Sequence, residues 1–219
     1  MKKCDSLDIS KFEAVIFDMD GTMVDNMQYH VRAWKEFVAL YGVELSEQQL
    51  SMIPGRKNSD LLQLLLDRTF TTEEVTQFSK EKEALYRKLY AGNVASVSGL
   101  FEVLAYLRQN SIQYAVATSA PKENRELVLR ELHLEDTFSV LVGEEDISKG
   151  KPDPEVYETC AKRLNVPSEQ CLVFEDALAG VQSAKAAGMT VVGVQTAGAN
   201  TQIEDADYSI DDFTQLTLR

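Results

Sequence analysis

The pair Asp18 and Asp20 is the first feature of this sequence that could do chemistry. One residue separates them, so an extended chain would direct both carboxylates to the same side. Two carboxylates that close repel each other, and a hard divalent cation would resolve the conflict. Because the apolar run at residues 15–17 leads directly into the pair, we expect a metal site at the end of a buried strand, and not a solvated turn.

Further oxygen donors occur later in the sequence, at Glu175 and Asp176. A small ligand set made only of oxygen atoms favours Mg²⁺ over Ca²⁺, so we expect Mg²⁺ as the cofactor. An EF-hand calcium loop does not fit, because that loop needs a glycine at its sixth position and a helix on either side. Here Gly21 is the fourth residue of the loop, and a predicted strand precedes it.

Five short apolar runs predict the strands that position these residues. They cover residues 14–17, 114–117, 138–142, 171–174 and 190–194 and are rich in β-branched residues. They do not alternate with polar positions, which is typical of strands buried on both faces of a parallel sheet. Helical segments separate them, so we predict an α/β fold with a Rossmann-like, doubly wound parallel sheet and right-handed crossovers.

The candidate site residues all follow these predicted strands. Ligands of open α/β sheets bind beyond the carboxyl ends of the strands, so residues at those ends are expected to converge on one edge. The residues concerned are Asp18, Thr118, Ser119, Lys151, Glu175 and Asp176.

One interval, residues 26–92, contains no strand-like run. Residues 27–41 are amphipathic, and capping boxes that begin at Ser46 and Thr71 open two further helices. We therefore predict a Rossmann-like core of residues 1–25 and 93–219, with an all-helical cap domain of residues 26–92 inserted after the first strand. Basic and acidic side chains balance within this cap, so the negative charge of the chain lies on the core.

Length and composition are typical of a folded globular protein, and the net negative charge disfavours binding to polyanions. The chain has 219 residues, 44% of them hydrophobic, and a net charge of −13, which disfavours nucleic acid and membrane surfaces as partners. Its three cysteines and two histidines form no zinc-binding pattern. The N-terminus lacks the apolar segment of a signal peptide, and no apolar run is long enough to cross a bilayer. We expect a cytoplasmic monomer with reduced cysteines.

The motifs together resemble those of the haloacid dehalogenase-like (HAD) phosphohydrolases. The first motif reads VIFDMDGT at residues 15–22, and Thr118, Lys151-Pro152 and the run EDALAG at residues 175–180 follow in the family's order. The resemblance covers essentially the whole chain, including the helical insertion. It is strongest to the branch that contains β-phosphoglucomutase and the small sugar-phosphate phosphatases.

The resemblance implies a role for each core residue. Asp18 would be the nucleophile that forms an aspartyl phosphate, and Asp20 the general acid and then the general base. Thr118, with Ser119 beside it, would bind a phosphoryl oxygen. Lys151 would neutralise the phosphoryl charge and hold Asp18 ionised.

The resemblance also implies the ligands of Mg²⁺. These are the side chains of Asp18, Glu175 and Asp176, and the backbone carbonyl of Asp20. The haloacid dehalogenases themselves attack carbon and need neither a metal nor a second aspartate. Asp20 and the acidic pair at 175–176 therefore favour chemistry at phosphorus.

Three cap residues match the mutase-like branch: His30, Trp34 and Lys82. His30 and Trp34 are four positions apart and share a helix face. Lys82 lies on an apolar stripe with Val75, Phe78, Leu85 and Leu89, where its ammonium must either reach solvent or meet an anion. The resemblance places this lysine toward the substrate.

The loop with Gly55 and Arg56 is a candidate for substrate specificity, because polar loops often carry it. The mutase pattern expects an arginine at position 58 to hold a second phosphate, and this sequence has Asn58. Arg56 or Lys57 could substitute, or no second phosphate is bound. We therefore expect a phosphatase of small phosphorylated metabolites. A β-phosphoglucomutase and a non-catalytic phospho-ligand binder are the alternatives.

Overall fold

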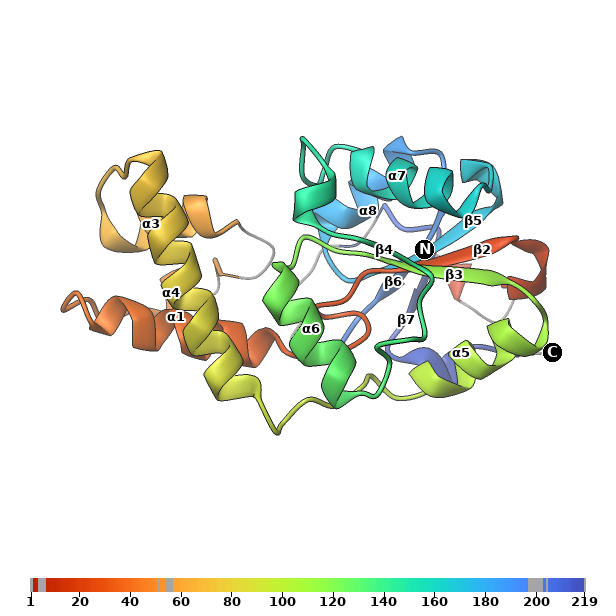
Figure 1. Cartoon of the computed structure of the whole chain (residues 1–219), viewed down its shortest axis with the longest axis horizontal. Helices are drawn as coiled ribbons and strands as arrows, with labels where there is room; N and C mark the ends of the chain where they lie inside the picture. The colour runs from red at the N-terminus through yellow and green to blue at the C-terminus, as the bar shows by residue number, and fades with distance from the viewer. Residues whose placement is uncertain are drawn as a thin grey trace. The chain divides into compact units, whose positions relative to one another are not determined.

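A computed structural model gives the three-dimensional structure of the chain (Figure 1). The structure describes residues 2–3, 7–50, 52–53, 57–196, 203 and 205–218. The chain divides into two compact units. The sheet unit comprises Met1–Asp25 and Ala95–Arg219, and the helical unit comprises Asn26–Val94.

A parallel sheet forms the centre of the sheet unit. Among the described residues it has seven strands, in the order β1-β7-β6-β5-β2-β3-β4, and every neighbouring pair is parallel. The strands are β1 (Lys2–Lys3), β2 (Ala14–Phe17), β3 (Gln113–Ala117), β4 (Val140–Val142), β5 (Cys171–Glu175), β6 (Thr190–Val194) and β7 (Tyr208–Ile210). This arrangement confirms the predicted Rossmann-like α/β fold.

The strand predictions hold where the apolar runs are continuous. The run predicted at residues 138–142 begins late, because Phe138 does not enter the strand and packs its ring edge-on against Tyr114, with centroids 5.6 Å apart. The two strands at one end of the sheet, β1 and β7, are not predicted from the sequence. They have only two and three residues, too few for a recognisable pattern.

Helices cover both faces of this sheet. Figure 1 shows α7 (Glu155–Leu164) and α8 (Leu178–Ala186) along one face and α5 (Leu100–Gln109) along the other. The remaining helices of the unit are α6 (Lys122–Glu131) and the short 3-10 helices η2 (Ile9–Lys11), η3 (Glu144–Asp146), η4 (Ser168–Gln170) and η5 (Phe213–Gln215). On the α5 face, the rings of Phe17 and Phe174 stack at 5.3 Å, with Phe213 edge-on to both. Such continuous apolar packing holds the carboxyl ends of β2 and β5 side by side.

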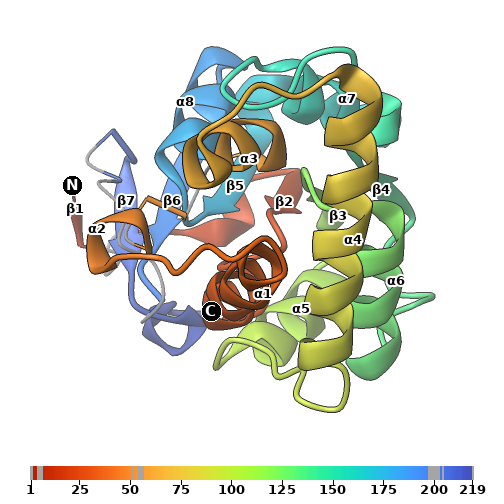
Figure 2. The same ribbon diagram turned by 90° about the vertical axis from the view of Figure 1, so that its left-hand side faces the viewer.

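The helical unit consists of α1 (Met27–Ala39), α2 (Glu47–Leu50), α3 (Asn58–Leu66) and α4 (Thr72–Tyr90). Helices α1 and α4 pack against each other, and Figure 2 shows α4 lengthwise with α1 nearly end-on. Trp34 and Phe37 of α1 form its core with leucines of α3. The capping box predicted at Thr71 is present, with Glu74 as its partner. No helix in the described ranges combines the length and apolarity that a bilayer crossing needs.

Candidate active site

The site lies where three neighbouring strands end. Strand β2 is the middle of the three, with β5 on one side and β3 on the other. Phe17 is level with both Phe174 and Val116, so the residues that follow these positions reach the same edge of the sheet. Asp18 continues the ladder by donating its N–H to the carbonyl of Phe174 at 3.0 Å.

Lys151 joins two of the carboxylates at this edge. Its Nζ donates to Oδ1 of Asp18 at 2.6 Å and also to Oε1 of Glu175. The side chain is buried, at 10% exposed, whereas Lys149 is 74% exposed and lies 3.6 Å from Asp153. Only Lys151 of these two lysines therefore belongs to the site.

The backbone loop that carries Lys151 is fixed by two side chains. The carboxylate of Glu155 accepts the N–H groups of Ser148 and Lys149, at 2.9 and 2.7 Å. The Ser183 hydroxyl of α8 donates to the carbonyl of Asp153 at 2.6 Å. These contacts tie the loop to α7 and α8, and so hold the lysine in place.

Glu175 is the most enclosed carboxylate, with no exposed surface. Besides Lys151, it accepts the phenol O–H of Tyr157 at 2.8 Å and the backbone N–H of Ala177 at 3.0 Å. The ring of Tyr157 also lies 5.1 Å from the Lys151 ammonium. No sequence pattern indicates Tyr157, because it comes from α7 and only the packing of that helix brings it to the strand end.

The three carboxylates Asp18, Glu175 and Asp176 fit a metal ion. One oxygen of each lies within 4.8 Å of the others, and all three residues are buried. If all are ionised, the three carboxylates exceed the Lys151 ammonium by two negative charges, which a divalent cation would balance. Asp20, half-buried, is not part of this group of side chains.

Glycine at position 21 leaves room for this cluster. Its φ is +82°, and a Cβ there would lie 2.1 Å from Oδ2 of Asp176. A side chain at this position would thus be strained and would also displace a carboxylate of the candidate metal site.

The pKa values show that, without a bound cation, burial and repulsion between the carboxylates make the ionised forms of Asp18 and Asp176 unfavourable. Burial raises the pKa of Asp18 from 3.8 to about 8; Lys151 lowers it, but Glu175 and Asp20 add to the rise. Burial, followed by Glu175 and Asp18, also raises the pKa of Asp176 well above 3.8. Burial lowers the pKa of Lys151, but Asp18 and Glu175 outweigh it and raise that pKa overall.

Lys151 lowers the pKa of Asp18, which is the direction expected from the sequence, while burial acts against it. A cation bound by the three carboxylates would act in the same direction as Lys151.

Thr118 lies at the end of β3, buried at 1% exposed, and Ser119 beside it is exposed. The Thr118 N–H donates to the carbonyl of Val142, which extends the pairing of β3 with β4. Its Oγ1 accepts the N–H of Ala120 at 3.1 Å, so its own O–H can donate to another acceptor.

The helical unit encloses a buried lysine. Lys82 is 1% exposed, and its Nζ lies 2.9 Å from both Nδ1 of His30 and Oε1 of Glu83. The ammonium is also 5.4 Å from the ring of Trp34. Of the two possibilities that the sequence left open, the lysine meets an anion and does not reach solvent.

The buried face of α4 differs from the apolar stripe that the sequence predicts for this helix. Its fully buried residues are Lys82, Glu83, Tyr86 and Tyr90, while Val75, Phe78 and Leu85 are only partly buried. Leu89 is also partly buried, and Tyr90 beside it takes the buried position.

Hydrogen bonds and stacking complete this cluster. Asn58 donates to Oε1 of Glu83 at 2.8 Å, and the His30 ring stacks on Tyr86 at 3.8 Å. Burial and the Lys82 charge lower the pKa of His30 to about 3. Burial would raise the pKa of Glu83, but Lys82, His30 and Asn58 lower it to about 2. The cluster therefore holds an ammonium, a carboxylate and a neutral imidazole near neutral pH. Gly55 and Arg56 lie outside the described residues.

Comparisons with known proteins agree with the fold and with the motif order. A family model described as haloacid dehalogenase-like hydrolase matches residues 15–194. A phosphorylated carbohydrates phosphatase of Thermotoga maritima is 33% identical over 177 residues, which are 81% of this chain and 82% of that protein. A β-phosphoglucomutase of Bacillus subtilis is 30% identical over 213 residues, 94% of this chain and 92% of that protein.

A solved structure gives the same result. It is a HAD hydrolase of family IA, variant 3, from Entamoeba histolytica, with a TM-score of 0.87 and 30% sequence identity. The similarity covers 94% of this chain and 95% of the other. This chain is therefore a member of the haloacid dehalogenase-like hydrolase family.

Proposed function

We propose that this protein is a Mg²⁺-dependent phosphatase that hydrolyses small phosphorylated metabolites, sugar phosphates in particular, through an aspartyl-phosphate intermediate. The observation that carries the proposal is the buried group of Asp18, Glu175 and Asp176, with Lys151 bonded to two of the three. The similarity to a phosphatase of phosphorylated carbohydrates supports the same substrate class.

In the first step, a carboxylate oxygen of Asp18 attacks phosphorus in line, and the bond from phosphorus to the substrate oxygen breaks. Asp20 donates its proton to that leaving oxygen. Lys151 neutralises charge on the phosphoryl oxygens, and the Thr118 hydroxyl donates a hydrogen bond to one of them.

In the second step, Asp20 takes a proton from water, which attacks phosphorus, releases inorganic phosphate and restores Asp18. When bound, Mg²⁺ would be held by Asp18, Glu175, Asp176 and the backbone carbonyl of Asp20, and would neutralise negative charge at the phosphoryl group. This charge would also offset the burial that raises the pKa of Asp18.

β-Phosphoglucomutase activity is the second candidate, supported by the similarity to the Bacillus subtilis enzyme. The environment of Asn58 favours hydrolysis instead. Its uncharged amide donates to Glu83 at 2.8 Å and leaves that position without the cation that the mutase pattern uses for a second phosphate. A non-catalytic binder is disfavoured, because Asp18, Lys151 and Asp176 are all retained and brought together.

Phosphate release tests the proposal. The protein is incubated with Mg²⁺ and a panel of sugar phosphates, and free phosphate is measured; we expect release from several of them. β-Glucose 1-phosphate with catalytic bisphosphate is then assayed for glucose 6-phosphate. Isomer formed without phosphate release would overturn hydrolysis in favour of the mutase. Asp18→Asn should abolish turnover and the exposed control Asp136→Asn should not, so an active Asp18→Asn protein would remove Asp18 as nucleophile.

A further inference from the structure

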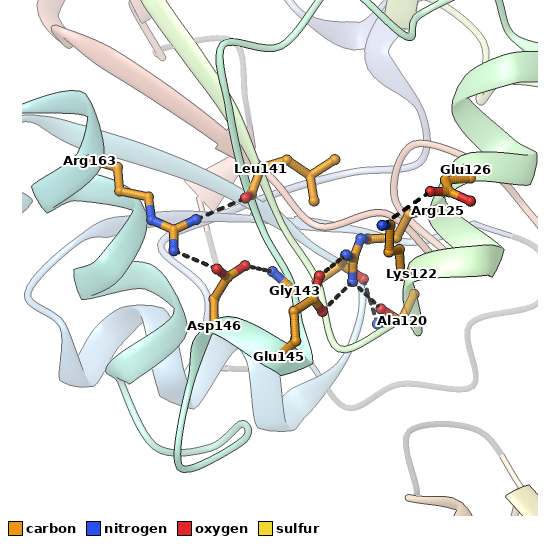
Figure 3. A network of polar contacts seen from close by, with 10 residues as sticks. Ala120, Lys122, Arg125, Glu126, Leu141, Gly143, Glu145, Asp146 and Arg163 are labelled. Atoms are coloured by element: carbon orange, nitrogen blue, oxygen red, sulfur yellow. Dashed lines mark hydrogen bonds and ion pairs between the residues drawn. The ribbon is translucent and has the colours of Figure 1, made fainter.

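Arg125, near the start of α6, is a buried cation that the proposed chemistry does not use. It is 4% exposed, and its side chain turns back toward the loop that follows β3. There its Nη1 donates to the carbonyl of Ala120 at 2.8 Å (Figure 3). A buried guanidinium bonded to backbone fixes the position of that backbone.

Glu145 of η3 provides the countercharge. Its Oε2 accepts from Nη1 of Arg125 at 2.9 Å, and its Oε1 accepts from Nη2, so guanidinium and carboxylate meet through two parallel bonds. Position 143 must be glycine for this approach, because a Cβ there would lie 2.0 Å from Nη1 of Arg125.

The turn that carries Glu145 is itself held in place. Asp146 accepts the N–H of Gly143 at 2.9 Å and a bond from Arg163 of α7. Arg163 also donates to the carbonyl of Leu141 in β4 at 3.1 Å. As Figure 3 shows, the backbone turn after β4 joins the contacts of Arg163 in α7 to those of Arg125 at the loop after β3.

Ala120 is the point at which this network meets the candidate site. Its carbonyl is held by Arg125, and its N–H donates to Oγ1 of Thr118. The Thr118 oxygen accepts this hydrogen bond, so the direction in which its O–H can point depends on where Ala120 lies. Arg125 therefore holds the same residue whose N–H bonds to the Thr118 hydroxyl.

We propose that Arg125, held by Glu145, is a positioning residue that orients the Thr118 hydroxyl and the adjacent backbone for a phosphoryl group. This inference rests on the proposed phosphatase function. The contact it controls is made to phosphate in the bound substrate as well as in the transition state, so its loss should weaken binding more than it slows the chemical step.

The test compares Arg125→Lys, which keeps the charge but cannot form the paired bonds, with Lys122→Ala. Lys122 lies on the same helix in an exposed ion pair with Glu126, and so serves as the matched control. KM for the best sugar phosphate and Kd for inorganic phosphate in the presence of Mg²⁺ are measured. For Arg125→Lys we expect both to rise about tenfold, with kcat changed less than about threefold. Lys122→Ala should match the unmodified protein.

A merely structural role gives a different result. Arg125→Lys would then lower kcat in proportion to the unfolded fraction and leave KM and Kd unchanged, which would overturn the inference. If Arg125→Lys does not fold, Glu145→Gln replaces it, since half of that carboxylate is exposed, and the same rise in KM and Kd is required. The proposed function fails separately, if the unmodified protein releases no phosphate from any sugar phosphate.

Discussion

A Cβ atom on Gly180 would lie 1.7 Å from Oε1 of Glu175, although the two residues are in different elements, α8 and β5. Glu175 has nowhere to move, because Lys151, Tyr157 and the Ala177 N–H all bind it. The glycine is therefore required by a carboxylate of the site and not by its own backbone conformation.

Gly180→Ala should accordingly reverse the usual effect of this substitution. Within a helix, alanine stabilises relative to glycine by about 0.5–1 kcal/mol. Here we expect a loss of about 1–3 kcal/mol in the free energy of unfolding, since the methyl group overpacks a buried site. Phosphate release should fall more than about tenfold as Glu175 is displaced. Urea unfolding and the phosphate assay check both values.

The control for this variant is Gln182→Ala, an exposed position on the same helix. It should keep full activity and stability. A Gly180→Ala protein that is more stable and equally active would show that Glu175 can relocate without cost.

Lys151→Gln should remove activity, while Lys149→Gln should not. The first variant leaves Asp18 and Glu175 without their shared cation, and losses at a preorganised charged group are on the order of 10²–10³-fold in kcat. The second removes only an exposed ion pair with Asp153, worth about 0–1 kcal/mol. Steady-state kinetics of both proteins give the comparison. Equal loss in the two variants would refute the assignment of Lys151.

Much of the sheet and of its active edge could be predicted from sequence because both depend on local patterns. The run at residues 14–17 is buried and apolar, and Asp18 must follow it at the strand end. Strand β7 escaped prediction because three residues carry little periodic signal, and its place in the sheet is set by pairing with β6.

The partners of the site residues could not be predicted in this way. Tyr157 and Arg125 reach the strand ends from helices, and their contacts depend on how those helices pack. Lys82 and Glu83 are adjacent in sequence, and neighbours on a helix do not face each other, so spacing argued against their contact. The long lysine side chain nevertheless brings the two charges to 2.9 Å inside the helical unit.

Asp176→Asn should abolish stabilisation by Mg²⁺. In the unmodified protein, added Mg²⁺ should raise Tm, because an ion that binds only the folded state shifts the equilibrium toward it. The amide removes one of the three grouped carboxylates, so the rise in Tm with Mg²⁺ should fall by more than half. Thermal unfolding at several Mg²⁺ concentrations measures this effect without any turnover.

Glu135→Gln, an exposed carboxylate outside the cluster, should keep the full rise in Tm. An undiminished rise in Asp176→Asn would mean that Mg²⁺ acts elsewhere on the protein. Removal of Mg²⁺ by a chelator should return the unmodified protein to its starting Tm.

The neutral His30 should make the helical unit sensitive to mild acid. Its pKa is about 3 in the folded chain against 6.5 ordinarily, so between these values only the unfolded chain takes up the proton. His30 should therefore lower the free energy of unfolding of the helical unit as the pH falls from 6.5, at up to roughly 1.4 kcal/mol per pH unit. Asp18 and Asp176, whose raised pKa values act in the opposite direction, lie in the sheet unit. The measurement uses the range from pH 6.5 to 5. Below pH 4.5, the ordinary pKa of a glutamate, the lowered pKa of Glu83 adds a separate loss of stability.

His30→Asn removes the titrating group and retains an acceptor for the Lys82 ammonium. We expect this variant to be less stable, because the stacking on Tyr86 is lost, but its helical unit to lose less than half as much stability between pH 6.5 and 5 as that of the unmodified protein. Trp34, the single tryptophan of the chain, is buried in the helical unit, so its fluorescence during urea unfolding reports on this region. His133→Asn, which removes the other histidine at an exposed position, should keep the original pH dependence. The same slope in His30→Asn as in the unmodified protein would mean that His30 is not the group responsible.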